Sequence, residues 1–307
     1  MIFSKMIRMP FVSMRSIGFI LLLSVFVLFS SCRKEQPLSF QVAMASRMTA
    51  VPFYIISSIS TKIQWDVIVE PDEAKRLDML LNGEVQAIEW DVLRLYQRGI
   101  SDEMPHTIGI LPVNTPYALI SNPKITSTRL TEKNQIVGID YQGIRTFLLD
   151  YWLKGASKTR ESAISDELRM QRLTEGEVQA VIVSEPSITQ LSREGYVTLA
   201  STQGSGLVLG TLTVLSSTEK KLLRNVLLDY QQMLNQLDYI RKNPDRFLAK
   251  KLPHYNTDWL YYIPKTIYFS PQLFQEVNTW LHLNNPTFPS LSYEEVFWIP
   301  KDNEHDN

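Results

Sequence analysis

The sequence contains few of the residues that build catalytic and metal centres. Cys32 is its only cysteine, so the chain forms no internal disulfide, and its four histidines are scattered without metal-ligand spacing. It has no G-x-S-x-G motif and no phosphate-binding glycine loop, because residues 204–206 (Gly-Ser-Gly) lack both the spacing and the strand–helix setting. No pair of carboxylates has a spacing typical of acid–base catalysis. We therefore expect a protein that is not an enzyme, with no catalytic residue, cofactor or metal.

The sequence also lacks an excess of either positive or negative charge. The chain has 31 basic and 32 acidic residues, a formal net charge of −1, and no basic block. Nucleic-acid binding needs a concentrated positive face, so we expect no nucleic-acid partner. Beyond the N-terminus, no apolar run approaches the length of a transmembrane helix.

The N-terminus has the pattern of a secretion signal. Lys5, Arg8 and Arg15 precede an apolar run at residues 17–29, which is too short to span a bilayer but is typical of a signal-peptide core. The run ends in Ser30-Ser31-Cys32, which resembles the lipobox of bacterial lipoproteins. That resemblance implies cleavage before Cys32, diacylglycerol on its sulfur and acylation of the new N-terminus by a fatty acid such as palmitate. The alternative is a plain membrane anchor with an incidental cysteine.

A pentapeptide occurs twice in the chain. Gly-Glu-Val-Gln-Ala occupies residues 83–87 and again residues 176–180, 93 residues later (176 − 83). Each copy follows an amphipathic stretch and enters an apolar, strand-like segment, which is typical of an α/β unit with a buried parallel strand. Two copies at this distance favour two similar lobes rather than a solenoid. Coincidence is the alternative, because the pentapeptide uses common residues.

Hydrophobic patterning gives the order of the elements. Leu38–Met44, Ile63–Val69 and Ile136–Ile139 are predicted strands, and residues 46–49 a loop after the first of them. Predicted helices cover residues 51–60, with Pro52 in the first turn, and then residues 144–154, 219–240 and 271–281. Asn243-Pro244 is expected to interrupt the third of these helices.

This order of segments resembles a family. GEVQAIEWD (83–91), GIDYQG (138–143), GEVQAVIVSEP (176–186) and YIRKNPDRF (239–247) are similar to segments of the substrate-binding proteins of ABC importers. The group concerned handles sulfonates, taurine, nitrate and thiamine precursors, and the resemblance covers about residues 38–281. The family has aspartate where Gln86 and Gln179 stand.

The resemblance implies an α/β fold of the type II periplasmic-binding-protein class, with two lobes of mostly parallel sheet flanked by helices. Residues 1–31 would be the signal peptide and 32–37 a tether. Residues 38–118 with 210–307 would form the first lobe and residues 119–209 the second. Hinge strands are expected near Tyr117–Ser121 and residues 206–210. The protein would be a monomer facing the periplasm or cell exterior, partnered by an ABC permease and its ATPase.

Open α/β sheets bind ligands beyond the carboxyl ends of their strands. This rule selects eleven candidate ligand-binding residues: Thr49, Glu89, Trp90, Asp91, Asn114, Thr115, Asp140, Tyr141, Gln142, Ser184 and Glu185. Several have simpler explanations. Trp90 is equally compatible with core packing, Asp91 and Asp140 with helix capping, and Glu185 with a turn before Pro186.

The acids among these candidates indicate the ligand. Glu89, Asp91, Asp140 and Glu185 come without an obvious basic partner, which favours a cation or hydrogen-bond donor over an anion. Aromatic residues at the same positions could stack a flat ring. We therefore expect a small polar ligand, such as an amine-bearing pyrimidine of the thiamine-precursor type. The alternatives are a sensor or scaffold lipoprotein that binds a protein partner, or an enzyme of thiamine-pyrimidine type.

Overall fold

The computed structural model describes residues 37–98, 106–126, 130, 135–139, 143–154, 159–162, 165–203 and 205–300. The predicted signal peptide, Cys32 and residues 301–307 lie outside the described residues, so processing and lipidation stay predictions. None of the helices in the described part of the chain has the length and hydropathy needed to cross a membrane.

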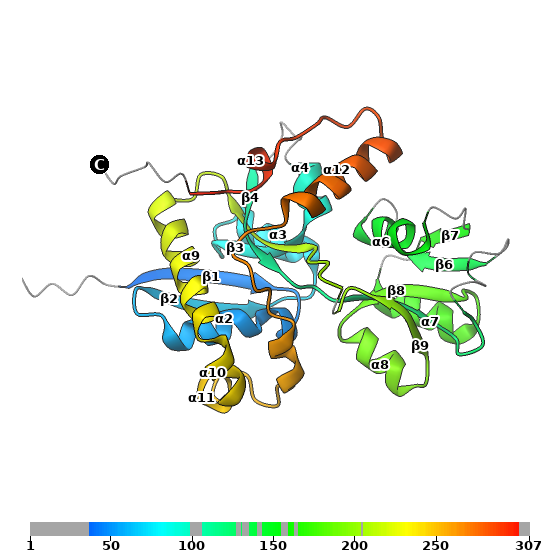
Figure 1. Cartoon of the computed structure of the whole chain (residues 1–307), viewed down its shortest axis with the longest axis horizontal. Helices are drawn as coiled ribbons and strands as arrows, with labels where there is room; N and C mark the ends of the chain where they lie inside the picture. Colours follow the sequence, from blue (N-terminus) through cyan, green and yellow to red (C-terminus); the bar gives the residue numbers. More distant parts are fainter. Residues whose placement is uncertain are drawn as a thin grey trace, which may run out of the picture. The chain divides into compact units, whose positions relative to one another are not determined.

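The first sheet, sheet A, has five strands in the order β2-β1-β3-β10-β4 (Figure 1). Its strands are β1 (Leu38–Met44), β2 (Ile63–Val69), β3 (Ala87–Asp91), β4 (Thr107–Val113) and β10 (Gly210–Leu215). Strand β1 pairs in parallel with β2 and β3, whereas β10 runs antiparallel between β3 and β4. One strand from the second half of the chain therefore completes a sheet built from the first.

The second sheet, sheet B, repeats this arrangement in the order β7-β6-β8-β5-β9. Its strands are β5 (Tyr117–Ser121), β6 (Ile136–Ile139), β7 (Thr159–Ser162), β8 (Ala180–Ser184) and β9 (Val197–Ser201). Strand β6 is parallel to β7 and β8, and β5 is antiparallel to β8 and β9. The chain passes from sheet A to sheet B at residues 114–116 and returns within residues 202–209. Strand β5, expected as a hinge, is paired along its length in sheet B.

Helices follow most of the strands. Around sheet A these are α2 (Arg47–Ile59), α3 (Glu73–Leu81) and α4 (Val92–Arg98), and around sheet B α6 (Ile144–Leu153), α7 (Asp166–Glu175) and α8 (Ser187–Arg193). The C-terminal part of the chain forms α9 (Lys220–Asn235), α10 (Leu237–Lys242), α11 (Asp245–Leu248), a 3-10 helix η1 (Thr257–Tyr261), α12 (Pro271–Asn284) and α13 (Tyr293–Val296). Helix α10 ends just before Asn243-Pro244, as predicted.

The repeated pentapeptide lies at the same place in each sheet. Gly83 and Gly176 follow α3 and α7 with φ of 74° and 79°, a conformation that favours glycine. The side-chain oxygen of Gln86 accepts from the Gln41 amide at 2.7 Å, and that of Gln179 accepts from the Ile136 amide at the same distance. The following strands, β3 and β8, belong to different sheets, so the prediction of two similar lobes is confirmed.

Helix α2 begins earlier than the sequence indicates. Ser46 is its N-cap and forms a capping box with Thr49, so the prediction of a loop at residues 46–49 is wrong. Pro52 therefore lies in the second turn rather than the first. Because proline has no N–H, the Met48 carbonyl lacks its usual helical donor.

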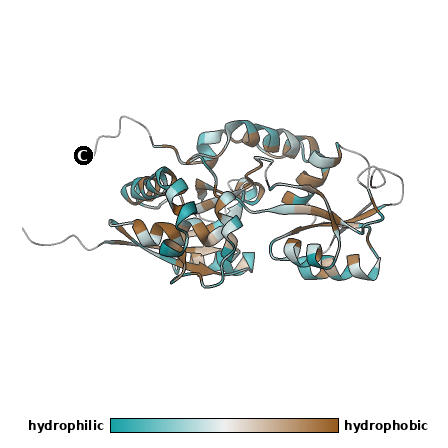
Figure 2. Ribbon diagram, turned by 60° about the horizontal axis from the view of Figure 1, so that its bottom comes forward, coloured by the Kyte–Doolittle hydropathy of each residue, from teal (hydrophilic) through white to brown (hydrophobic). Residues whose placement is uncertain are grey.

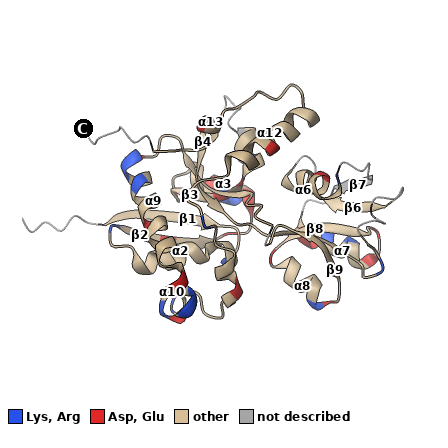
Figure 3. Ribbon diagram, viewed as in Figure 1, with Lys and Arg blue, Asp and Glu red and all other residues tan. Residues whose placement is uncertain are grey.

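Apolar side chains of α2 and α9 fill the core on one face of sheet A. Phe40, Phe53 and Tyr230 are among the fully buried members of this cluster. Figure 2 shows hydrophobic residues on the strands and on the sheet-facing sides of the helices. Figure 3 shows both charge signs side by side at α10, where Asp238 precedes Arg241 and Lys242.

Helix α12 contacts helices from both parts of the chain. Phe274 stacks on Tyr96 of α4, with ring centroids 5.2 Å apart. Trp280 meets Phe147 of α6 edge-on at 5.7 Å, and its indole N–H donates to Asp150 at 3.0 Å. Since α4 packs against sheet A and α6 against sheet B, α12 joins the two.

Candidate functional site

Glu89 connects three segments at the carboxyl end of sheet A. Its side chain is buried, and one carboxylate oxygen accepts from the Thr49 hydroxyl at 2.5 Å and the Ala45 amide at 2.8 Å. The other oxygen accepts from the Thr115 hydroxyl at 2.5 Å. Three predicted site residues are thus brought together, and the polar groups of each are used by the others.

A close backbone approach supports this junction. A Cβ added to Gly210 would lie 2.6 Å from both the Thr115 hydroxyl and the Val113 carbonyl. Glycine at the start of β10 therefore leaves room for the segment that leads from sheet A to sheet B. Any larger residue would push Thr115 away from Glu89.

Trp90 and Asp91 contact the neighbouring helices. Trp90 is 4% exposed, packs beside Leu77 and Leu80, and donates its indole N–H to Glu73 at 2.9 Å. Asp91 accepts from the Arg94 amide at 2.9 Å and so caps the first turn of α4. These contacts account for both residues by packing and capping.

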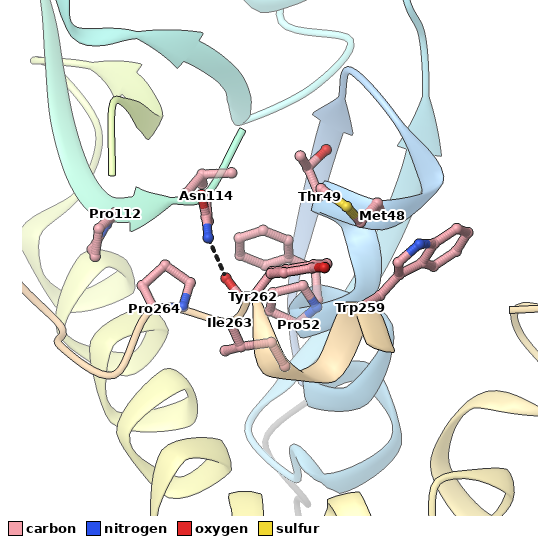
Figure 4. A pocket seen from close by; sticks show the side chains of 11 residues that line it. Met48, Thr49, Pro52, Pro112, Asn114, Trp259, Tyr262, Ile263 and Pro264 are labelled. Carbon is pink, nitrogen blue, oxygen red and sulfur yellow. Dashed lines mark hydrogen bonds between the residues drawn. The ribbon is translucent and has the colours of Figure 1, made fainter. Parts of the chain in front are cut away.

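Asn114 lies beside a small pocket (Figure 4). Its side-chain amide N–H donates to the Tyr262 carbonyl at 2.9 Å, while its Oδ1 atom is buried and has no hydrogen-bond partner. The pocket lies between the start of α2, the end of β4 and the segment around η1, and has a volume of about 10 Å³. That volume is close to the minimum for one water molecule.

Ser184 lies at the carboxyl end of sheet B and contacts a buried charge cluster. Its amide and hydroxyl donate to Asp166 at 2.9 and 2.8 Å. Asp166 also accepts from Arg145 at 3.1 Å and from Arg169, which is 2% exposed. Burial raises the pKa of the Asp166 carboxyl, but the two arginines and the Ser184 amide outweigh it and lower the pKa overall.

Arg145 is a basic residue that the sequence reasoning missed. Its guanidinium lies 5.2 Å from the centre of the Tyr117 ring, and its side chain is 16% exposed. The acids at these strand ends were expected to have no basic group beside them. The signal available in the sequence was its position in the first turn of the helix after Ile136–Ile139.

Glu185 lies next to Ser184, at a cis peptide bond to Pro186. Its carboxylate accepts from the amide and hydroxyl of Thr189, at 3.2 and 3.0 Å. Asp140, Tyr141 and Gln142 lie outside the described residues, so their role stays a prediction. Among the residues that the structure does describe, no group of three or more histidines, cysteines or acids could hold a metal ion.

Solved structures provide the comparison, since no protein-family profile and no curated protein matches the chain. The ligand-binding component of an ABC-type import system from Staphylococcus aureus, solved with zinc bound, has a TM-score of 0.68 at 11% identity, over 85% of this chain and 96% of that one. The alkanesulfonate-binding protein SsuA from Xanthomonas axonopodis pv. citri, bound to MOPS, has a TM-score of 0.62 at 16% identity, over 85% and 99%.

The periplasmic aliphatic sulphonate binding protein SsuA from Escherichia coli has a TM-score of 0.63 at 11% identity, over 89% of this chain and 96% of that one. The chain therefore has the two-lobed fold of the periplasmic binding proteins, as the sequence predicted. At these identities the likeness extends to the fold alone.

Proposed function

We propose that this chain is the substrate-binding protein of an ABC importer, which captures a small polar molecule outside the cytoplasm. One observation carries the proposal: the two five-stranded sheets have equivalent strand arrangements. Solved structures with this fold include ligand-binding components of import systems. The two sheets would act as a hinged clamp on the solute. Such a protein binds and delivers its ligand without turning it over.

The anchoring part of the proposal rests on the sequence. Lipid on Cys32 would hold a monomer on a bacterial membrane, facing the periplasm or the exterior, through the tether at residues 32–37. Its partners would be the permease and ATPase of the importer. Residues 38–118 with 210–307 would form one lobe of the clamp, and residues 119–209 the other.

The proposed ligand contacts come from both sheets. Asn114 and Thr115 would line the first side, with Thr49, Glu89, Trp90 and Asp91 behind them. Ser184 and Glu185 would line the second, with Asp140, Tyr141 and Gln142. The hydrogen bonds of Glu89 favour a positioning role, because both of its carboxylate oxygens already accept hydrogen bonds from the surrounding segments.

We favour an amine-bearing heterocycle, such as a thiamine-precursor pyrimidine, as the solute. The buried Asn114 oxygen needs a donor, and Glu185 supplies a negative charge. A sulfonate is the second candidate. The Arg145–Asp166–Arg169 cluster brings two guanidinium groups to this end of sheet B, and a guanidinium can bind an anionic group such as a sulfonate. Two structurally similar proteins are named as sulfonate binders.

A thermal-shift screen of sulfonates, polyamines, pyrimidines and flavins tests the proposal. A solute that binds only the folded protein raises its Tm in proportion to RT ln(1 + [L]/Kd). Calorimetry on the hits would then separate an amine from a sulfonate, since Glu185→Gln should weaken only the amine. A screen without hits, together with stable capture of a single protein partner, would favour the scaffold alternative. Turnover of a hit would support an enzyme instead.

A further inference from the structure

The orientation of the Asn114 amide is determined by its neighbour. The Tyr262 carbonyl can only accept a hydrogen bond, so the group 2.9 Å from it must be the amide nitrogen. The amide oxygen is therefore the atom that is buried without a partner. A buried carbonyl oxygen without a donor is destabilising, and such atoms are rare in folded proteins.

The pocket beside Asn114 has apolar walls. Met48 and Thr49 come from the start of α2, and Trp259 and Tyr262 come from η1 and its end (Figure 4). The Thr49 hydroxyl is occupied by Glu89 and by the Ser46 carbonyl. Pro52 also lines the pocket and leaves the Met48 carbonyl without its helical donor. The Tyr262 hydroxyl and the Trp259 indole N–H can also donate, but among the lining side chains it is Asn114 Oδ1 that is buried without a partner, and this oxygen needs a donor.

The carboxylates near the pocket also favour a hydrogen-bond donor or a cation as the ligand group. Desolvation raises the pKa of the Tyr262 phenol, and the Asp258 and Glu185 carboxylates raise it further. Both carboxylates are therefore near enough to act on the phenol. A negative potential at this position favours a positively charged or hydrogen-bond-donating group over an acceptor.

We infer that this pocket is a subsite for a donor nitrogen, an amino or ammonium group carried on a flat ring, with Asn114 Oδ1 as its acceptor. The cavity of about 10 Å³ admits only the head group, in place of one water molecule. The ring would lie at the mouth against Trp259 and Tyr262, which are side chains that sequence reasoning did not select. The inference rests on the proposed solute-binding function and specifies which part of the solute occupies the pocket.

Two probes of similar size, one with a donor group and one without, test the subsite on the whole chain. The probes are 4-amino-2-methylpyrimidine and 2,4-dimethylpyrimidine, each at millimolar concentration, with calorimetry and thermal shift as readouts. We expect the amine to bind the wild-type protein about tenfold more tightly than the dimethyl compound, since a methyl group gives Asn114 Oδ1 no hydrogen bond. Equal binding of the two probes, or no binding of the amine, would overturn the inference without any variant.

Asn114→Leu removes the acceptor and should weaken the amine about tenfold while abolishing discrimination between the probes. Asn284→Leu is the matched control, because the Asn284 amide also donates to a backbone carbonyl, at 2.9 Å, but lies on α12 away from the pocket. Unchanged amine affinity in Asn114→Leu would overturn the inference. If another solute from the screen binds both variants equally, the importer proposal survives and the subsite does not.

Discussion

At the scale of single residues, two carboxylates hold the loops at the carboxyl ends of the sheets. Glu89 does so with neutral donors, two threonine hydroxyls and one backbone amide. Asp166 does so mainly with arginines and with Ser184. Loss of either carboxylate should therefore affect stability in different ways.

Glu89→Gln should destabilise the fold by about 1–3 kcal/mol. The new NH₂ group would face a hydroxyl or amide that is already a donor, and would leave at least one buried donor unpaired. Urea unfolding followed by circular dichroism measures the change. Glu185→Gln, at a partly exposed site, is the control and should change the free energy of unfolding by less than about 0.5 kcal/mol. Equal changes in the free energy of unfolding for the two substitutions would contradict the role of Glu89 in holding the three segments together.

Asp166 predicts a pH dependence of stability. Because its folded pKa lies below the ordinary value of 3.8, the carboxylate stabilises the fold above that value, and this stabilisation is lost as pH falls through the folded pKa. Asp166→Asn should therefore lower Tm strongly at pH 7. The difference in Tm between the variant and the wild-type protein should become smaller below about pH 4. Tm measured across this range tests the sign. A gap that is constant with pH would show that the charge of Asp166 contributes nothing.

The candidate site could be predicted from the sequence only in part. Strand ends are readable from hydrophobic patterning, so the rule of carboxyl ends selected Thr49, Glu89 and Thr115, which do meet. Hydrophobic patterning does not predict the direction of a side chain. Trp90 was therefore selected as a ligand contact, whereas it packs against α3. Trp259 and Tyr262 reach the pocket from about 145 residues further along the chain, at a distance where periodicity carries no information.

At the scale of secondary-structure elements, the repeated unit is held by equivalent backbone contacts. In each copy the glutamine amide and side chain bond to the neighbouring parallel strand, and the residues after the glycine bond back to the preceding helix. These local signals are strong, which is why the sequence predicted both units. The start of α2 was missed because its capping box is formed by Ser46 and Thr49 without the acidic third residue typical of the motif.

Gly83→Ala and Gly176→Ala should be destabilising by similar amounts, about 1 kcal/mol each. Both glycines have positive φ, and an added Cβ meets no atom within 4 Å at either position, so the cost comes from backbone strain and not from a steric clash. Urea midpoints of the two variants measure this. A difference above about 1 kcal/mol would mean that the two copies are not energetically equivalent.

At the scale of the whole molecule, Cys32→Ala tests the predicted anchor. If Cys32 carries lipid, the variant should keep its leader and lose labelling by a fatty-acid probe, because the modified sulfur is absent. Gel mobility and probe fluorescence of membrane fractions measure both effects. Unchanged processing of the variant, with no label on the wild-type protein, would refute lipidation.

Helix α12 would restrain the motion of the proposed clamp. Because Phe274 contacts α4 and Trp280 contacts α6, rotation of one sheet relative to the other strains or detaches one end of this helix. Such strain lowers the fraction of unliganded protein in any conformation that loses these contacts. If that conformation is the one that binds the solute, the apparent Kd for the solute rises as the fraction falls. The same stored strain would speed the reverse rotation. Under the proposed importer function, a solute held in such a conformation would be bound less tightly and released faster, so the contacts of α12 would set the balance between capture and delivery.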